Sequence, residues 1–234
     1  MSHPITFDDF SSALLVMAGH DVRQPLQLIT AAHDRLARFL HGSEQRQELA
    51  RAAAATTQLA EMLNQLVEAV RLREQSGNDL HVIVPLRPIL DGLASEFTKP
   101  AWLKGVSLRI PPAGHALLSH PVLLTGMLRN LIRNAIDYTP RGGAVCVTCC
   151  RYGSELRIEV RDTGVGIRAN ALPAIFKAFQ RSDESGVDGL GPGLFIAKYA
   201  ADLLGHRVRV RSAEGIGSTF AIITNAVPDT ARAV

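Results

Sequence analysis

Apolar residues in the first third of the chain recur at spacings of three and four, the period of an amphipathic helix. Between the two apolar seams, Gly42 and Ser43 are typical of a helix stop and a following N-cap. The pattern predicts a helical hairpin. Because one hairpin leaves both seams uncovered, it also predicts a four-helix bundle formed by two chains. The seams are Val22, Leu26, Ile29, His33, Leu36 and Leu40, and Leu49, Ala53, Thr56, Leu59, Leu63, Leu66 and Val70.

The pattern changes at Ser76-Gly77-Asn78-Asp79, beyond which short strand and helix segments alternate. The predicted fold class is α+β, with a helical hairpin over residues 1–76, a two-layer α/β sandwich over 80–226 and a tail over 227–234. Strands are expected over 81–86, 106–110, 115–119, 144–152, 155–161, 206–212 and 218–224, and helices over 88–103, 121–138, 170–178 and 194–204.

Composition is that of an ordinary globular protein, with 47% hydrophobic and 20% charged residues. The net charge of +3 is spread along the chain, which favours a solvated basic face over a nucleic-acid or membrane surface. No apolar run is long enough to span a membrane, and the first ten residues lack the basic region of a signal peptide. We expect the clustered Cys146, Cys149 and Cys150 to be buried small side chains in a reducing, cytoplasmic compartment.

The segment around His20 combines a histidine, the acidic neighbour Asp21 and a proline, Pro25, inside a predicted helix. An internal proline removes a helix hydrogen bond, so its presence beside the His-Asp pair indicates a site. Asp21 would orient the imidazole and accept its proton, leaving a ring nitrogen to attack phosphorus. Taken alone, a histidine that is merely solvated on a helix is the simpler interpretation.

Asn130 and Asn134 lie one turn apart on an otherwise apolar face of the 121–138 helix. Asparagine is a mediocre helix former, so two of them on this face need a reason. Their neutral amide oxygens suit a Mg²⁺ ion held mainly by nucleotide phosphates and water. Two helix-exposed amides are the alternative.

Two glycine-rich segments complete the candidate chemistry. Asp162-Thr163-Gly164-Val165-Gly166 directly follows a strand, where glycines permit a flat ligand to approach and a buried carboxylate accepts from an amine such as that of adenine. Gly189-Leu190-Gly191-Pro192-Gly193-Leu194 opens a helix whose amide groups form a phosphate cradle. The second segment lacks the ending of a P-loop and does not follow the first strand of a βαβ unit.

The order of these motifs, together with Phe176-x-x-Phe179, resembles that of bacterial two-component sensor histidine kinases. The resemblance covers residues from about 11 to about 220 and implies a dimerisation and phosphoacceptor hairpin followed by a Bergerat-type ATP-binding domain. By this resemblance the phosphoacceptor is His20 and the Mg²⁺ ligand is Asn134. Further roles implied are Asn130 beside the phosphates, Tyr138 near the adenine, Asp162 on its amino group, Gly164 and Gly166 in the adenine-side turn, Phe179 in the hinge of the ATP lid, Arg181 on phosphate, and Gly189, Gly191, Gly193 and Leu194 in the lid.

The implied activity is transfer of phosphate from Mg-ATP to His20 and then to an aspartate of a response regulator, in a homodimer whose signal comes from a separate protein or an upstream sensor domain. Gln24 would orient a water toward the regulator's phospho-aspartate, or cap the carbonyl freed by Pro25. Asp137 stands where the family often has a basic residue, for which Arg133 or Lys177 would compensate. The alternatives are an ATP-driven conformational clamp of the same superfamily and a phosphotransfer scaffold with a decayed nucleotide domain.

Overall fold

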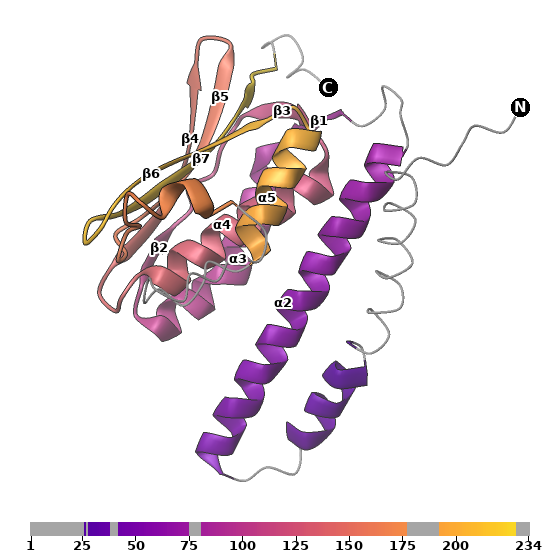
Figure 1. Cartoon of the computed structure of the whole chain (residues 1–234), viewed down its shortest axis with the longest axis vertical. Helices are drawn as coiled ribbons and strands as arrows, with labels where there is room; N and C mark the ends of the chain where they lie inside the picture. Colours follow the sequence, from indigo (N-terminus) through magenta and orange to yellow (C-terminus); the bar gives the residue numbers. More distant parts are fainter. Residues whose placement is uncertain (1–25, 27, 38–41, 75–80, 177–191, 228–234) are drawn as a thin grey trace, which may run out of the picture. The chain divides into compact units, whose positions relative to one another are not determined.

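The computed structural model describes residues 26, 28–37, 42–74, 81–176 and 192–227, which belong to two compact units, Met1–Ser76 and Gly77–Val234 (Figure 1). In the first unit, residues 28–37 are helical and helix α2 runs from Ser43 to Glu74. The break between the two helices therefore lies where Gly42 and Ser43 predict it. The start of the first helix, with His20, Asp21 and Gln24, lies outside the described residues.

The predicted apolar seams are only partly covered in the single chain. Ile29, Leu36 and Leu59 are 43%, 51% and 54% exposed, whereas Thr56 and Val67 are buried. Large aliphatic side chains at this exposure favour burial against another surface. The homodimer stays a prediction, and the exposed seam residues are where it would form.

The second unit contains every strand that the sequence pattern predicts, in the predicted order. Its main elements are β1 (Val82–Pro85), α3 (Leu86–Lys104), β2 (Ser107–Arg109), β3 (Ala116–Ser119), α4 (Pro121–Tyr138), β4 (Ala144–Tyr152), β5 (Glu155–Asp162), α5 (Pro192–Leu203), β6 (Arg207–Ala213) and β7 (Gly217–Asn225).

One helix prediction was wrong. The segment 170–178 was expected to be an α-helix, but only a short 3₁₀ helix, η2 (Leu172–Ala174), forms in its described part. Pro173 removes a backbone donor in the middle of the segment, so a longer hydrogen-bonded ladder is not available. The bonds that do form include Ala171 N–H to Arg168 O and Ala174 N–H to Ala171 O, which are i to i+3 contacts.

Five strands form the main sheet in the order β2-β4-β5-β7-β6, and β1 and β3 form a separate antiparallel pair. Only β2 runs parallel to its neighbour in the main sheet. Helices α3, α4 and α5 cover one face of this sheet (Figure 1). The core between the layers includes Leu128 and Leu131 of α4 and Ile158 of β5, all fully buried. The predicted two-layer α/β sandwich is confirmed.

The cysteines are less buried than predicted. All three are free thiols, with Cys146 and Cys149 half-buried and Cys150 exposed. Consecutive strand residues alternate between faces, so Cys149 and Cys150 cannot both enter the core. Burial raises the pKa of the Cys149 thiol to about 12. In the described part of the chain, no helix is long and apolar enough to cross a membrane.

A buried polar pair joins the small sheet to the main one. Ser119 Oγ lies 2.9 Å from His206 Nε2, and the two residues are 0% and 4% exposed. The His81 ring lies 6.5 Å from the His206 ring. Burial, assisted by the charge of His81, lowers the pKa of His206 to about 4. His206 is therefore neutral in the folded chain at pH 7.

Acidification should destabilise the second unit through His206. The pKa of this histidine is lowered from 6.5 to about 4 on folding, so its contribution to stability is present above pH 6.5 and is lost as the pH falls toward 4. Between pH of about 7.5 and about 5 this group should cost about 2 kcal/mol of unfolding free energy. Urea unfolding of the wild type and His206→Gln at both pH values measures the difference, and equal pH dependence would contradict the assignment.

Candidate functional site

Asp162 is the last residue of β5 and lies at the end of the sheet beneath the helices. It is 5% exposed, and its Oδ1 accepts hydrogen bonds from Gly164 N–H at 2.9 Å and Ser218 N–H at 3.1 Å. Among the described residues, nothing donates to Oδ2. Burial raises the pKa of Asp162, against the lowering effect of the two backbone donors. Oδ1 thus connects the turn after β5 to the start of β7, and Oδ2 is available to a ligand.

The glycines that follow Asp162 are required by close backbone contacts. A Cβ on Gly164 would overlap the Tyr138 carbonyl and lie 2.8 Å from Asp162 Oδ1. Gly166 has φ +69°, and a Cβ there would overlap the carbonyl of Ala213. The predicted tight turn after β5 is therefore present, and it leaves no side chain between Asp162 and the C-terminal end of α4.

The hairpin of β6 and β7 supports the site in a way that the sequence did not predict. Ser212 Oγ accepts from Ile167 N–H at 2.8 Å and donates to Gly217 O at 3.0 Å. Gly217 has φ +120°, and a Cβ there would overlap Asp162 O. Ser218 supplies the second donor to the carboxylate. The contacts of this hairpin with Asp162 depend on strand register, which no local pattern specifies.

Helix α4 brings both predicted asparagines toward the start of α5. Asn130 is 4% exposed, and its Nδ2 donates to the carbonyl of Gly193 at 3.3 Å. Asn134 is half-buried, and its buried Nδ2 has no hydrogen-bond partner among the described residues. The interpretation of these residues as two solvated helix amides is wrong for Asn130. An unsatisfied buried amide is costly, so Asn134 has the properties of a ligand-binding group.

The C-terminal end of α4 is fixed by a lysine that the sequence did not single out. Lys104, at the end of α3, donates from Nζ to the carbonyl oxygens of Ile136, at 2.8 Å, and Asp137. The Ile136 carbonyl also accepts from Thr139 N–H at 3.3 Å. A cation at this position bonds to carbonyls of the last turn and interacts well with the helix dipole. The Tyr138 carbonyl accepts from Val165 N–H at 3.2 Å, which ties α4 to the turn after Asp162.

Other predicted residues are placed as follows. Gly193 and Leu194 are buried in the first turn of α5. Arg133 lies over the Phe97 ring at 5.9 Å and 3.9 Å from Glu96 Oε1, so it faces α3. Burial raises the pKa of Asp137, and the charges of Lys104 and Arg133 act in the opposite direction. His20, Asp21, Gln24, Phe179, Arg181, Gly189 and Gly191 lie outside the described residues.

These groups fit an adenine nucleotide. A free carboxylate oxygen on a buried aspartate can accept from an exocyclic amine, and the Gly164 turn leaves a surface without side chains beside it. The Asn134 amide can offer a neutral oxygen to a hard cation. Among the described residues no cluster of three or more histidine, cysteine, aspartate or glutamate side chains can hold a metal ion.

Comparison with known proteins agrees with this geometry. Residues 119–228 match the family described as histidine kinase-, DNA gyrase B-, and HSP90-like ATPase. Sensor histidine kinase AtsR of Burkholderia thailandensis is 29% identical over 222 residues, covering 90% of this chain and 36% of the relative. Sensor protein SrrB of Staphylococcus aureus is 25% identical, covering 95% and 39% respectively. The chain thus spans less than half the length of these curated relatives.

Solved structures show the same fold. The crystal structure of full-length ShkA in complex with AMPPNP matches with a TM-score of 0.67 and 24% identity, over 92% of this chain and 46% of that one. The catalytic domain of histidine kinase ThkA matches with a TM-score of 0.54 and 20% identity, over 63% of this chain and 99% of that one.

The fold and the site agree with the ATPase family shared by histidine kinases, DNA gyrase B and HSP90, which residues 119–228 match. Within that class, the predicted resemblance of the chain to sensor histidine kinases is confirmed.

Replacing Gly164 with alanine should destabilise the second unit by about 1–3 kcal/mol, because the added Cβ overlaps the Tyr138 carbonyl and cannot be accommodated without a backbone shift. Gly92→Ala is the matched control. No atom lies within 4 Å of a Cβ at Gly92, and alanine is the better helix former. Thermal unfolding of both variants should separate them, and equal melting temperatures would contradict the tight turn.

Proposed function

We propose that this chain is the catalytic core of a sensor histidine kinase. It transfers the γ-phosphoryl group of ATP to His20 and then passes that group to an aspartate of a response regulator. The observation that carries the proposal is the buried Asp162 carboxylate, which has one oxygen held by two backbone donors and the other open. The names of the relatives support the kinase class, and the complex of ShkA with AMPPNP supports a nucleotide ligand.

Adenine recognition rests on three groups. The free Asp162 oxygen accepts a hydrogen bond from the exocyclic amine. The Gly164 backbone lies flat beside the base, since it has no side chain. The Tyr138 side chain is half-buried at the end of α4 and packs near the adenine. Because Lys104 holds the carbonyls of Ile136 and Asp137, these groups are positioned before the nucleotide arrives.

Phosphate binding lies toward the start of α5. Asn130 Nδ2 donates to the Gly193 carbonyl there, and Asn134 Nδ2, which can donate to a phosphate oxygen, has no partner among the described residues. Mg²⁺, held by Asn134 and the phosphates, would neutralise charge on the phosphoryl oxygens. The amides at the start of α5 and in the glycine-rich segment before it contribute further positive potential.

The proposed phosphoryl transfer is an in-line displacement. A neutral ring nitrogen of His20 forms a bond to the γ-phosphorus while the bond to the β-γ bridging oxygen breaks, and ADP leaves. Asp21 accepts the imidazole proton. The second transfer moves the phosphoryl group to a carboxylate of the regulator and restores the imidazole. Gln24 is proposed to orient a water for dephosphorylation of the regulator.

The proposed assembly is a cytoplasmic homodimer formed through the helical hairpins. It receives its signal from another protein or from a sensor domain, and it docks a response regulator. Exposed Ile29, Leu36 and Leu59 support a second copy as the cover for the seams.

Asn134→Ala should weaken Mg²⁺-dependent nucleotide binding about tenfold.

His20→Gln should abolish labelling by γ-labelled ATP and leave nucleotide affinity within about twofold, because nucleophile and nucleotide site belong to separate units. Labelling of the wild type and of this variant, followed by acid and base treatment, checks the chemistry. Acid-labile, base-stable label that persists in His20→Gln would refute His20 as the acceptor. Its absence from the wild type would favour the ATP-driven clamp.

Nucleotide affinity should fall on acidification at a higher pH than for an ordinary aspartate, because burial raises the pKa of Asp162 and only the ionised form is a strong acceptor. Asp162→Asn should weaken binding about ten- to hundredfold near neutral pH and remove this pH dependence. Titration of a fluorescent ATP analogue between pH of about 5 and about 7.5 measures both. Parallel pH profiles for the two proteins would argue against the role of Asp162.

Leu63→Glu should dissociate the dimer, because it places an unpaired charge in the predicted seam. Sedimentation equilibrium measures this, with Glu48→Gln at an exposed position of the same helix as control. A wild-type chain that is monomeric at high micromolar concentration would contradict the assembly.

A further inference from the structure

The face of the main sheet opposite the helices carries arginines at one end. Strand register places residues from all five strands in one row, and directly paired residues point to the same face of a sheet. Arg209 lies two residues before Arg211 on β6 and therefore shares this face. The row is Arg109, Cys146, Arg161, Thr219 and Arg211.

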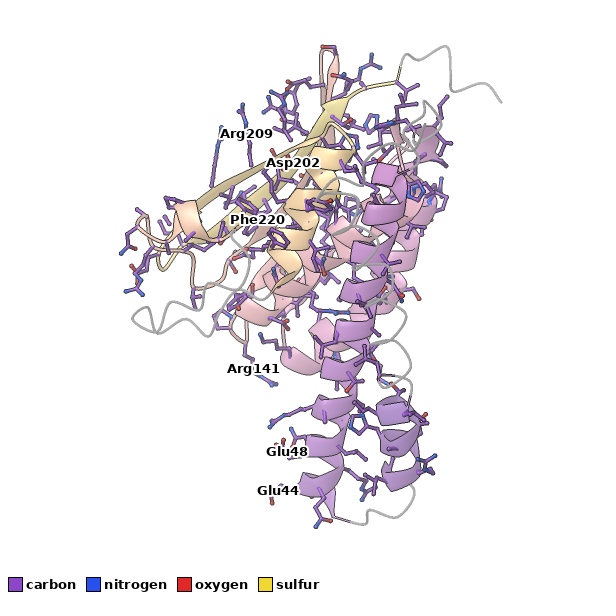
Figure 2. The ribbon with its side chains drawn as sticks, turned by 45° about the vertical axis from the view of Figure 1, so that its right-hand side comes forward. Glu44, Glu48, Arg141, Asp202, Arg209 and Phe220 are labelled. Carbon is purple, nitrogen blue, oxygen red and sulfur yellow. The ribbon has the colours of Figure 1, made fainter. Side chains whose placement is uncertain are left out.

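Burial shows that this face points to solvent. Val145, Val160 and Phe220, the neighbours on the opposite face, are 1%, 0% and 4% exposed. The four arginines are all exposed. In Figure 2, Arg209 projects from the sheet away from the helices, and Phe220 lies on the helix side. We call Arg109, Arg161, Arg209 and Arg211 the arginine face.

The arginine face differs from the other end of the same surface, where the charges are paired. There, Glu155 bonds to both Arg157, at 3.1 Å, and Arg207. No residue of the arginine face forms an ion pair with any residue that the structure describes. The acidic side chains at this end of the sheet are Glu159 on β5 and Glu214 in the β6–β7 turn. The arginine face is therefore a surface of excess positive charge.

A purely structural role does not explain all four arginines of the arginine face. Arginines two strands apart are separated by about 10 Å, where like charges repel weakly, by about 0.4 kcal/mol in water. Charged side chains on β6 protect an exposed sheet edge from pairing with other chains. That explanation does not extend to Arg161, because β5 lies between β4 and β7 and has no free edge.

We propose that the arginine face binds an acidic segment of a partner protein. Guanidinium groups are preorganised for two-point contacts with carboxylates, and the face uses arginine alone, without lysine. The residues between the arginines, Cys146, Thr148, Thr219 and Ala221, are small and let a peptide approach the sheet.

The composition of this end favours a protein over other anionic partners. The residues between the arginines on the strands offer no aromatic ring on which bases could stack, and the exposed Ile216 lies in the β6–β7 turn, outside the strand rows. Four arginines are also few for a nucleic-acid footprint, which typically neutralises about six to ten phosphates.

The test uses two double variants that are matched by strand register. Arg161 and Arg211 both pair with Thr219, and Arg157 and Arg207 both pair with Ile223. R161Q/R211Q and R157Q/R207Q therefore remove the same charge from the same two strands. The probe is a fluorescein-labelled peptide rich in glutamate, titrated into the full chain and followed by anisotropy at low and high salt.

The wild type should bind the peptide, with an affinity that falls as salt rises. R161Q/R211Q should weaken binding about tenfold, or about 1.4 kcal/mol, and R157Q/R207Q by about twofold or less. No binding by the wild type, or equal losses in the two variants, would overturn the proposal. Tighter binding of phosphatidylserine vesicles or duplex DNA through the same arginines would also overturn it. If R161Q/R211Q has a lowered melting temperature, R109Q/R209Q replaces it, with the same expectation.

Discussion

The structure of the site depends on one buried carboxylate. Asp162 Oδ1 receives the N–H groups of Gly164 and Ser218, which come from separate parts of the chain. A charge at this depth is stable only when it is well hydrogen-bonded, so the turn after β5 and the start of β7 must both be in place. The remaining oxygen is held at the same position, and a ligand amine that pairs with it meets a preorganised acceptor.

The same constraint explains why backbone spacing is so tight around the site. Gly164, Gly166 and Gly217 each face a carbonyl that a Cβ would overlap. Lys104 fixes the neighbouring end of α4, because its Nζ donates to the carbonyls of Ile136 and Asp137. The proposed adenine site therefore lies at the junction between the sheet and α4. The proposed phosphate site is formed by other groups, the asparagines of α4 and the start of α5.

Local patterns predicted the elements well and the contacts poorly. Helix α4 was predicted over 121–138, as observed, because the apolar period is strong and Pro121 is acceptable in the first turn. The separation of β1 and β3 from the main sheet, and the register that brings Ser218 to Asp162, depend on long-range pairing that a period of two does not encode. Lys104 was missed for the same reason, since its partners lie on another helix.

The proposed hydrogen bond between Asp162 and the exocyclic amine of adenine is tested most directly by comparing two ligands on the wild-type chain. Calorimetric titration with ATP and with purine riboside triphosphate, which lacks only that amine, isolates the contact without changing the protein. If Asp162 accepts from this amine, ATP should bind about ten- to hundredfold more tightly than the analogue, because the analogue lacks a hydrogen bond to a buried charge. Equal affinities for the two nucleotides would contradict it.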